Sequence, residues 1–523
     1  MDSRVQEGIP WLIIRRPSSK PRALCRETAK PRQLPQAEFD AWRARFEFGD
    51  LLAALPRLRP PEGQTATGPD ICLLQGGHNY LAHYRPQFDD IRAKLGKTDE
   101  QPLTRRVLKD TEGHLRQEVR ALIARWLRMQ NVCVLAGAGA SRCCNAPLGS
   151  DFASGVATLL SGRPTSALFK RLLDACVQPV DFERFLSQLG AIRRCLRPSE
   201  GTFRQPLSVG VAGGAGVSLD VTALDALLKD IEAAIGILCN VQLPSDENGG
   251  AAHCEFVGKL LSRDPTLGRV KLATTNYDTL FEQAMDRRSV LYADGFTGIV
   301  DRHFSPGVFG LDYYYPGEVG EGRVRRYDKF LHLYKLHGSI RWRRSPISDS
   351  DPYGVTYCGR ALPTLAEVES QSAELDDFFA RGCSPSCTNA AGLAILPTSA
   401  KYGESIAMPY SHLFRAFAEA LQEPQTVCLV VGYSGWDTHV NRLLQDALYN
   451  PSFTLVVVDP IVSAWTEALL RSDSCERVYA LCGDKGKFEE FAKLMPDVEQ
   501  LKTLAAVAKQ QRELNATWPQ PDA

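Results

Sequence analysis

Five polar or glycine-containing segments each follow an apolar run, and together their residue types could bind and cleave a nucleotide. They are Gly137–Ser141, Asn276–Asp278, His337, Gly432–Ser434 and Asp459. Closely spaced glycines leave backbone N–H groups bare for a diphosphate. An asparagine amide donates and accepts hydrogen bonds at once, and a histidine can take up a proton near neutral pH. Any one segment alone is equally well a turn or a helix cap.

The first segment, Gly137–Ser141, follows the continuous apolar run Val132–Ala136, which predicts a strand buried on both faces of a parallel sheet. A helix can start directly after the two glycines, with free N–H groups at its first turn. The third glycine of the dinucleotide fingerprint is absent. For this stretch alone, a ligand-free turn and a phosphate-binding turn explain the residues equally well.

The other segments also follow predicted strands, and a helix is predicted after Asn276–Asp278 and after Gly432–Ser434. The strands are expected at 270–273, 330–336, 426–431, 453–458 and 477–481. This repeated order predicts an α/β fold with a doubly wound, Rossmann-like parallel sheet. Because the carboxyl ends of such strands line one crevice, all five segments would face it.

Length and composition indicate that the chain has more than one structural region. Of the 523 residues, 1–112 are rich in Pro and Arg and are interpreted as an accessory N-terminal region. Residues 113–508 would form the main domain, and 509–523 a polar tail. The main domain is expected to contain a helical insertion at about 150–265 and loop-rich insertions at about 290–330 and 345–390. Within the first insertion, the glycine-rich segment Ser208–Ser218 is expected to be a flexible loop.

Charge and cysteine usage narrow the class of protein. Lys plus Arg equals Asp plus Glu, at 61 each, so no overall field attracts nucleic acid or an anionic membrane. No apolar run is long enough to span a bilayer. The 15 cysteines are scattered rather than arranged as a secreted disulfide framework. We therefore expect a cytoplasmic protein.

The ordered series of motifs resembles the sirtuin family, and most closely the sirtuin-like NAD-hydrolysing domains of bacterial phage-defence proteins. The motifs that carry the resemblance are Gly137–Ser141, Thr274–Asp278, Leu336–Ser339, Gly432–Ser434 with Asp437, and Val458–Asp459. They extend over roughly 130–485. Residues 1–112 have no counterpart in the family.

The resemblance implies a catalytic pair, in which Asn276 orients the nicotinamide ribose and the attacking water and His337 is the general base. The NAD-binding set that it implies is Gly137, Ala138, Gly139, Ser141, Asp278, Gly432, Ser434 and Asp459. Within this set, the glycine loop would hold the diphosphate and Asp278 the nicotinamide carboxamide. Gly432 and Ser434 would contact phosphate and ribose, and Asp459 the adenosine ribose.

The chain also departs from the deacylating sirtuins, which hold a structural zinc ion with two CxxC pairs. The corresponding interval has only Cys358, Cys383 and Cys387, so no metal is expected. In contrast, Tyr402–Glu404 lies at an offset similar to that of the deacylase substrate segment. The remaining histidines, which include His253, are interpreted as structural.

The leading hypothesis is an NAD glycohydrolase that cleaves NAD to nicotinamide and ADP-ribose and depletes NAD during phage infection. The alternatives are an NAD-dependent protein deacylase and a non-catalytic NAD or ADP-ribose sensor. A sensor would predict loss of Asn276 or His337, and both are present. The expected partners are NAD, further copies of the chain and an activating protein or phage-derived trigger, with neither a membrane nor nucleic acid.

Overall fold

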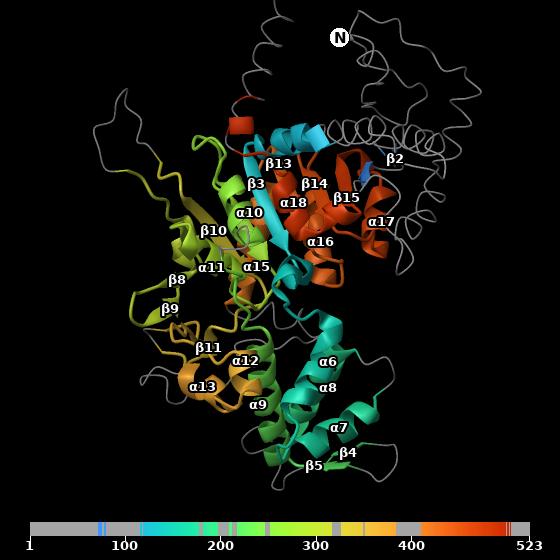
Figure 1. Cartoon of the computed structure of the whole chain (residues 1–523), viewed down its shortest axis with the longest axis vertical. Coiled ribbons are helices and arrows are strands. Elements are labelled where there is room, and N and C mark those ends of the chain that lie inside the picture. Colours follow the sequence, from blue (N-terminus) through green and yellow to red (C-terminus); the bar gives the residue numbers. More distant parts are fainter. Residues whose placement is uncertain are drawn as a thin grey trace, which may run out of the picture. The chain divides into compact units, whose positions relative to one another are not determined.

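The computed structural model describes the chain as two compact units, whose described residues are shown in colour in Figure 1. The described residues are 72–75, 78–79, 116–117, 119–176, 181–196, 209–211, 217–245, 251–315, 326–348, 351–382, 409–497, 499–501 and 503. Most of the accessory region, the tail 509–523, Cys383, Cys387 and Tyr402–Glu404 lie outside them. Unit 1 consists of residues up to Val132, Ser262–Leu267 and the chain from Leu421, and unit 2 of Cys133–Leu261 and Gly268–Ala420.

A parallel sheet forms the centre of unit 2. Its strands, in spatial order, are β3 (Asn131–Ala136, of which the first two residues belong to unit 1), β6 (Lys271–Thr274), β10 (Phe330–Lys335) and β7 (Leu291–Ala293). Every residue of β3 and β10 is buried. Such strands need apolar residues on both faces, and both are mostly apolar in the sequence, apart from Asn131 in β3 and His332 and Lys335 in β10.

Helices connect these strands. One-turn α5 (Ala138–Ser141) and the 3₁₀ turn η3 (Arg142–Cys144) follow β3, and α11 (Leu280–Arg287) follows β6. Helix α10 (Ala252–Leu260) packs against α11, and α15 (Tyr410–Gln422) comes later in the chain. The predicted strand–loop–helix order and the α/β fold class are confirmed.

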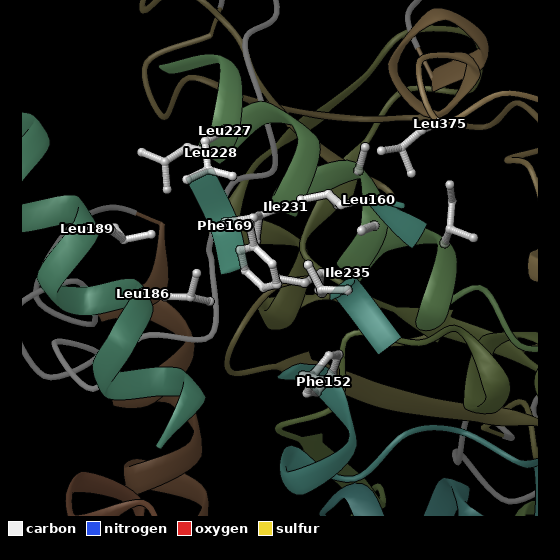
Figure 2. Packing of buried hydrophobic residues seen from close by; sticks show 14 of the residues in the cluster. Phe152, Leu160, Phe169, Leu186, Leu189, Leu227, Leu228, Ile231, Ile235 and Leu375 are labelled. Atoms are coloured by element: carbon white, nitrogen blue, oxygen red, sulfur yellow. The ribbon is translucent and has the colours of Figure 1, made fainter. Parts of the chain in front are cut away.

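Between η3 and α10, unit 2 contains a group of helices whose hydrophobic core also includes residues from 340–378, such as Leu375 and Phe378. Its helices are α6 (Phe152–Leu159), α7 (Ser166–Asp174), α8 (Phe182–Leu196) and α9 (Val221–Leu238). Figure 2 shows how Phe152, Phe169, Leu186 and Ile231 gather in this core. The segment expected to be a flexible loop instead carries the antiparallel pair β4 (Val209–Val211) and β5 (Val217–Leu219), because its valines alternate with small residues.

Most of a small second sheet lies in the two insertions expected to be loop-rich, and its strand β11 lies between them. Its order is β11 (Trp342–Arg344), β12 (Val355–Tyr357), β9 (Arg302–Phe304) and β8 (Phe296–Thr297). Aromatic residues hold it together, including Phe296, Phe304 and Trp342 at ring-centroid separations of 5.2–6.2 Å. The helices α12 (Leu365–Glu369) and α13 (Asp377–Gly382) follow. The prediction of loops was therefore wrong for these strands, which are too short to give a clear period.

Unit 1 is built on three parallel strands, β13 (Thr426–Val431), β14 (Thr454–Val458) and β15 (Val478–Cys482). Strand β1 (Cys72–Gln75) adds an antiparallel neighbour to β15, and β2 (His78–Asn79) pairs with β1. Helices α16 (Thr438–Ala447), α17 (Ala464–Leu470) and α18 (Phe488–Leu494) accompany the strands. None of the helices in the described part of the chain has the length and apolarity needed to cross a membrane.

Candidate functional site

The glycine loop has the predicted strand–turn–helix form. Gly137 is extended at the N-cap of α5, with φ of −107°, and Ala140 N–H donates to Gly137 O at 3.0 Å. The helix lasts one turn before the chain enters η3. Ala140 and Ser141 are buried. The loop is thus a compact turn with a buried end, and it does not begin a long helix.

The ends of β3 and β6 are tied together directly beneath this loop. Thr274 Oγ1 donates to Ala136 O at 3.0 Å, and Thr275 N–H donates to the same carbonyl at 3.0 Å. The backbone N–H of Asn276 in turn donates to Thr274 Oγ1 at 3.0 Å. The glycine loop and the asparagine segment therefore leave the sheet as neighbours.

A buried hydrogen-bond network joins the two segments through their side chains. Asn276 Nδ2 donates to Gly137 O and to Ser141 Oγ, both at 2.9 Å. Ser141 Oγ donates to Asp278 Oδ2 at 2.7 Å. The exposed fractions of Ser141, Asp278 and Asn276 are 1%, 5% and 6%. The sequence motifs predicted that these residues meet, but not that they bond to one another.

This network fixes the orientation of the Asn276 amide. Facing a carbonyl oxygen and a hydroxyl that already donates elsewhere, the amide must present its NH₂ group. Both amide hydrogens are then used, and Oδ1 has no hydrogen-bond partner among the residues that the structure describes. The oxygen of Asn276 is left as an acceptor for a further donor.

A buried lysine supports Asp278 from the strand beneath it. Lys335, the last residue of β10, donates through Nζ to the backbone carbonyl of Asp278 and lies 3.2 Å from Glu282 Oε1. Asp278 Oδ1 accepts from the N–H of Leu280, the first residue of α11, at 3.0 Å. Burial raises the pKa of Glu282, and the charge of Lys335 opposes that shift. Sequence reasoning missed Lys335, whose only signal is a cation at the end of an apolar strand.

His337 follows β10 and is buried. Its ring lies 6.4 Å from that of Phe414 in α15. Gly338 has φ of +84°, and a Cβ atom there would lie 3.3 Å from Tyr410 Oη. A side chain at position 338 would thus be both strained and crowded, so glycine is needed for the turn that carries His337. Since β10 is parallel to β6, His337 leaves the same edge of the sheet as Asn276.

The predicted residues of unit 1 follow two neighbouring parallel strands, β13 and β14. Gly432 has φ of 60° and donates through its N–H to Val458 O at 3.0 Å. Ser434 is exposed, and Trp436 nearby is 87% exposed. Asp437 occupies the N-cap position of α16 as expected, although its side chain makes no capping bond.

Asp459 stabilises its own turn. Its Oδ1 accepts from Ile461 N–H at 2.9 Å, and burial raises the pKa of its carboxyl group. The predicted residues thus form two sets, one at the strand ends of each unit. That both sets share one crevice stays a prediction.

Comparison with known proteins supports a sirtuin-like interpretation of part of the chain. Residues 270–460 match the family model of the SIR2-like domain. This segment contains Asn276, Asp278, His337 and Asp459, whereas the glycine loop precedes it. No curated protein matches the chain.

Among solved structures, similarity is found to mutant and complexed Sir2 homologues. A mutant Sir2 homologue in complex with ADP-ribose has 16% identity and a TM-score of 0.34, with 74% of this chain and 97% of that chain covered. A complex of a Sir2 homologue with NAD has 15% identity and a TM-score of 0.32, with 74% and 93% covered. The strand pairing described above defines the fold independently of them.

Proposed function

We propose that the chain is an NAD glycohydrolase that cleaves the bond between nicotinamide and ribose and releases ADP-ribose. The observation that carries the proposal is the fixed amide of Asn276, whose NH₂ group is held by Gly137 O and Ser141 Oγ. The match of residues 270–460 to the SIR2-like domain supports it. The role in depleting NAD during phage infection rests on the resemblance of the motifs.

Asn276 would position the nucleophile. With both amide hydrogens occupied, Oδ1 is the atom that can accept a hydrogen bond from water. Such a bond aligns a lone pair of the water toward the ribose carbon without removing a proton. Holding the amide in advance lowers the entropy lost in reaching the transition state.

His337 would take the proton that the water loses as it bonds to the ribose. The reaction passes through a ribose with oxocarbenium character, and the leaving nicotinamide becomes neutral as its bond breaks. No strong acid is therefore needed, whereas a base with a pKa near neutrality is useful. The buried turn before Gly338 would hold the imidazole ring in place for this transfer.

Asp278 would anchor the nicotinamide carboxamide. Each of its oxygens accepts one hydrogen bond within the protein, from Ser141 and from Leu280 N–H, and each keeps a further lone pair. The glycine loop would receive the diphosphate through backbone N–H groups. In unit 1, Gly432 and Ser434 would contact phosphate and ribose, and Asp459 would accept from the adenosine ribose hydroxyls.

The test is incubation of the purified full chain with NAD, with and without an acetylated peptide, followed by separation of the products. We expect nicotinamide and ADP-ribose from NAD alone. We expect His337→Gln to lower kcat by about a hundredfold or more, because a positioned base contributes at least that much. His303→Gln, in a half-exposed histidine of β9, is the matched control and should keep wild-type activity.

Asn276→Ala should also lower kcat strongly, and Asn450→Ala serves as its control. O-acetyl-ADP-ribose that forms only with the peptide would replace the proposal with a deacylase. NAD binding without turnover, equal in wild type and Asn276→Ala, would favour a sensor. Turnover that survives in both Asn276→Ala and His337→Gln would show that the catalytic pair is misassigned.

A further inference from the structure

Directly after the glycine loop, two cysteines meet a histidine from a distant part of unit 2. Cys143 and Cys144 lie in η3, and His253 lies in α10. The two Sγ atoms are 3.9 Å apart, and Cys144 Sγ is 3.9 Å from His253 Nδ1. All three atoms lie within 4.8 Å of one another. Two thiols and an imidazole are a donor set that suits zinc.

Two of the three separations are close to the edges of a tetrahedron around one ion. With Zn–S of about 2.3 Å and Zn–N of about 2.0–2.1 Å, tetrahedral angles place two sulfurs about 3.8 Å apart and a sulfur and a nitrogen about 3.6 Å apart. The two 3.9 Å separations exceed these edges by a few tenths of an ångström at most, and the third pair, Cys143 Sγ and His253, lies within 4.8 Å. A disulfide would instead need the sulfurs at about 2.05 Å. Cys143 and Cys144 are therefore free thiols, and their spacing allows both sulfurs to bind one metal ion.

We propose that Cys143, Cys144 and His253 bind one Zn²⁺ ion through two thiolates and one imidazole nitrogen. The thiol protons pass to solvent as the ion binds, and the two thiolates neutralise its charge. A fourth position remains for water, as in sites that have three protein ligands. The site is different from the paired-cysteine zinc module of deacylating sirtuins, because all three ligands precede the asparagine motif and the two cysteines lie in η3, directly after the glycine loop.

The histidine of the proposed site is held by its packing, whereas the two cysteines are accessible to an ion from solvent. His253 is fully buried, and its ring packs edge-on against Phe281 of α11 with centroids 4.9 Å apart. Cys143 and Cys144 are half-buried, so an ion can approach from their side. Ser141, two residues before Cys143, belongs to the Asn276 network. A bound ion would therefore tie the loop that starts at Gly137 to α10.

The sequence alone could not reveal this site. His253 lies 109 residues after Cys144, and adjacent cysteines lack the CxxC spacing of familiar zinc motifs. The expectation of no metal was drawn from a different interval, after His337. The proposal does not depend on NAD hydrolysis.

Cobalt titration of the full chain, purified under reducing conditions and freed of metal, tests the proposal. We expect one equivalent of Co²⁺ to produce the near-ultraviolet charge-transfer band of cobalt–thiolate bonds, and Zn²⁺ to displace it. The double variant Cys143→Ser/Cys144→Ser should lose the band. His253→Gln should weaken binding by more than the 10–100-fold or so that follows loss of an outer-shell partner. The matched control is Cys176→Ser/Cys475→Ser, which removes two other half-buried thiols.

Circular dichroism of each metal-free variant shows whether it folds. If His253→Gln does not, the cysteine double variant decides, since its side chains are half-exposed. The site is supported if the cysteine double variant loses the band while the wild type and the control keep it. Zinc should also raise the Tm of the wild type and of the control, but not that of the cysteine double variant. Absence of the band in wild type, or a band of equal intensity in the double variant, overturns it.

Discussion

The strand ends of the two units have the same topology but differ in how their polar residues are held. In unit 2, Ser141, Asn276 and Asp278 are buried and bonded to one another. In unit 1, Ser434 is exposed, and Asp459 Oδ1 accepts a hydrogen bond from Ile461 N–H in its own turn. Groups that act on a reacting bond gain from being fixed in advance. Groups that only bind a ligand can adjust to it, so the contrast agrees with the catalytic role that we propose for the residues of unit 2.

The largest expected effect on stability comes from substitution of Lys335, the buried lysine that contacts Asp278 and Glu282. Lys335→Met leaves the buried Glu282 carboxylate without its partner and should lower the free energy of unfolding by about 3–5 kcal/mol. In unit 1, Arg442→Ala removes the exposed pair with Asp446 and should change it by at most about 1 kcal/mol. Denaturant unfolding measures both. Equal effects would remove the contrast, and Lys335→Met/Glu282→Leu should recover most of the loss.

The next effect concerns His332 in β10. Burial, with help from the charge of Lys271, lowers its pKa to about 4. The unfolded chain has a histidine pKa near 6.5, so it binds the proton first as the pH falls. Stability is therefore complete above about pH 6.5 and falls between 6.5 and 4, by on the order of 3 kcal/mol. Unfolding curves at several pH values should show this slope, and His332→Phe should flatten it. An unchanged slope would contradict the assignment.

Two matched serine variants compare the units directly. Ser141→Ala removes the hydroxyl between Asn276 and Asp278 and should lower stability by about 1–3 kcal/mol, with a fall in kcat. Ser434→Ala lies on an exposed turn and should stay within about 0.5 kcal/mol of wild type while raising KM for NAD. Steady-state kinetics and denaturant unfolding separate the two outcomes. A kcat effect at Ser434 without one at Ser141 would reverse the comparison.

The smallest effect is expected at Asp459. Because burial raises its pKa in the folded state, the folded chain holds the proton more tightly than the unfolded chain. Stability should therefore decrease as the pH rises from about 3.9, the ordinary aspartate value, through the raised pKa. Asp459→Asn keeps the acceptor for Ile461 N–H and should abolish this segment of the pH profile. If the variant kept it, another carboxylate would be responsible.

Much of the fold could be predicted because strands buried on both faces are long apolar runs. Strands β3 and β13 are such runs after a polar first residue, and β10 is largely apolar apart from His332 and Lys335. The predicted bounds of all three agree within a residue or two. Strands β8 and β9 were missed because two or three residues carry no readable period. The approach of Asn276 to Ser141 followed from strand order, since both segments end neighbouring parallel strands. Lys335 and His253 could not be found, because what each contacts depends on packing between elements far apart in sequence.

The division of the chain also sets the order in which it can fold during synthesis. Unit 2 is drawn almost entirely from Cys133–Ala420, whereas unit 1 joins segments from both sides of it. Strand β1 must wait for β15, and Asn131 for the carbonyl groups of Pro424 and Gln425. At ordinary translation rates of about 5–20 residues per second, that interval lasts on the order of tens of seconds. The buried faces of β1 and of the helix at 119–127 have no partner strands from unit 1 throughout it, which leaves apolar surface of the nascent chain open to chaperone binding.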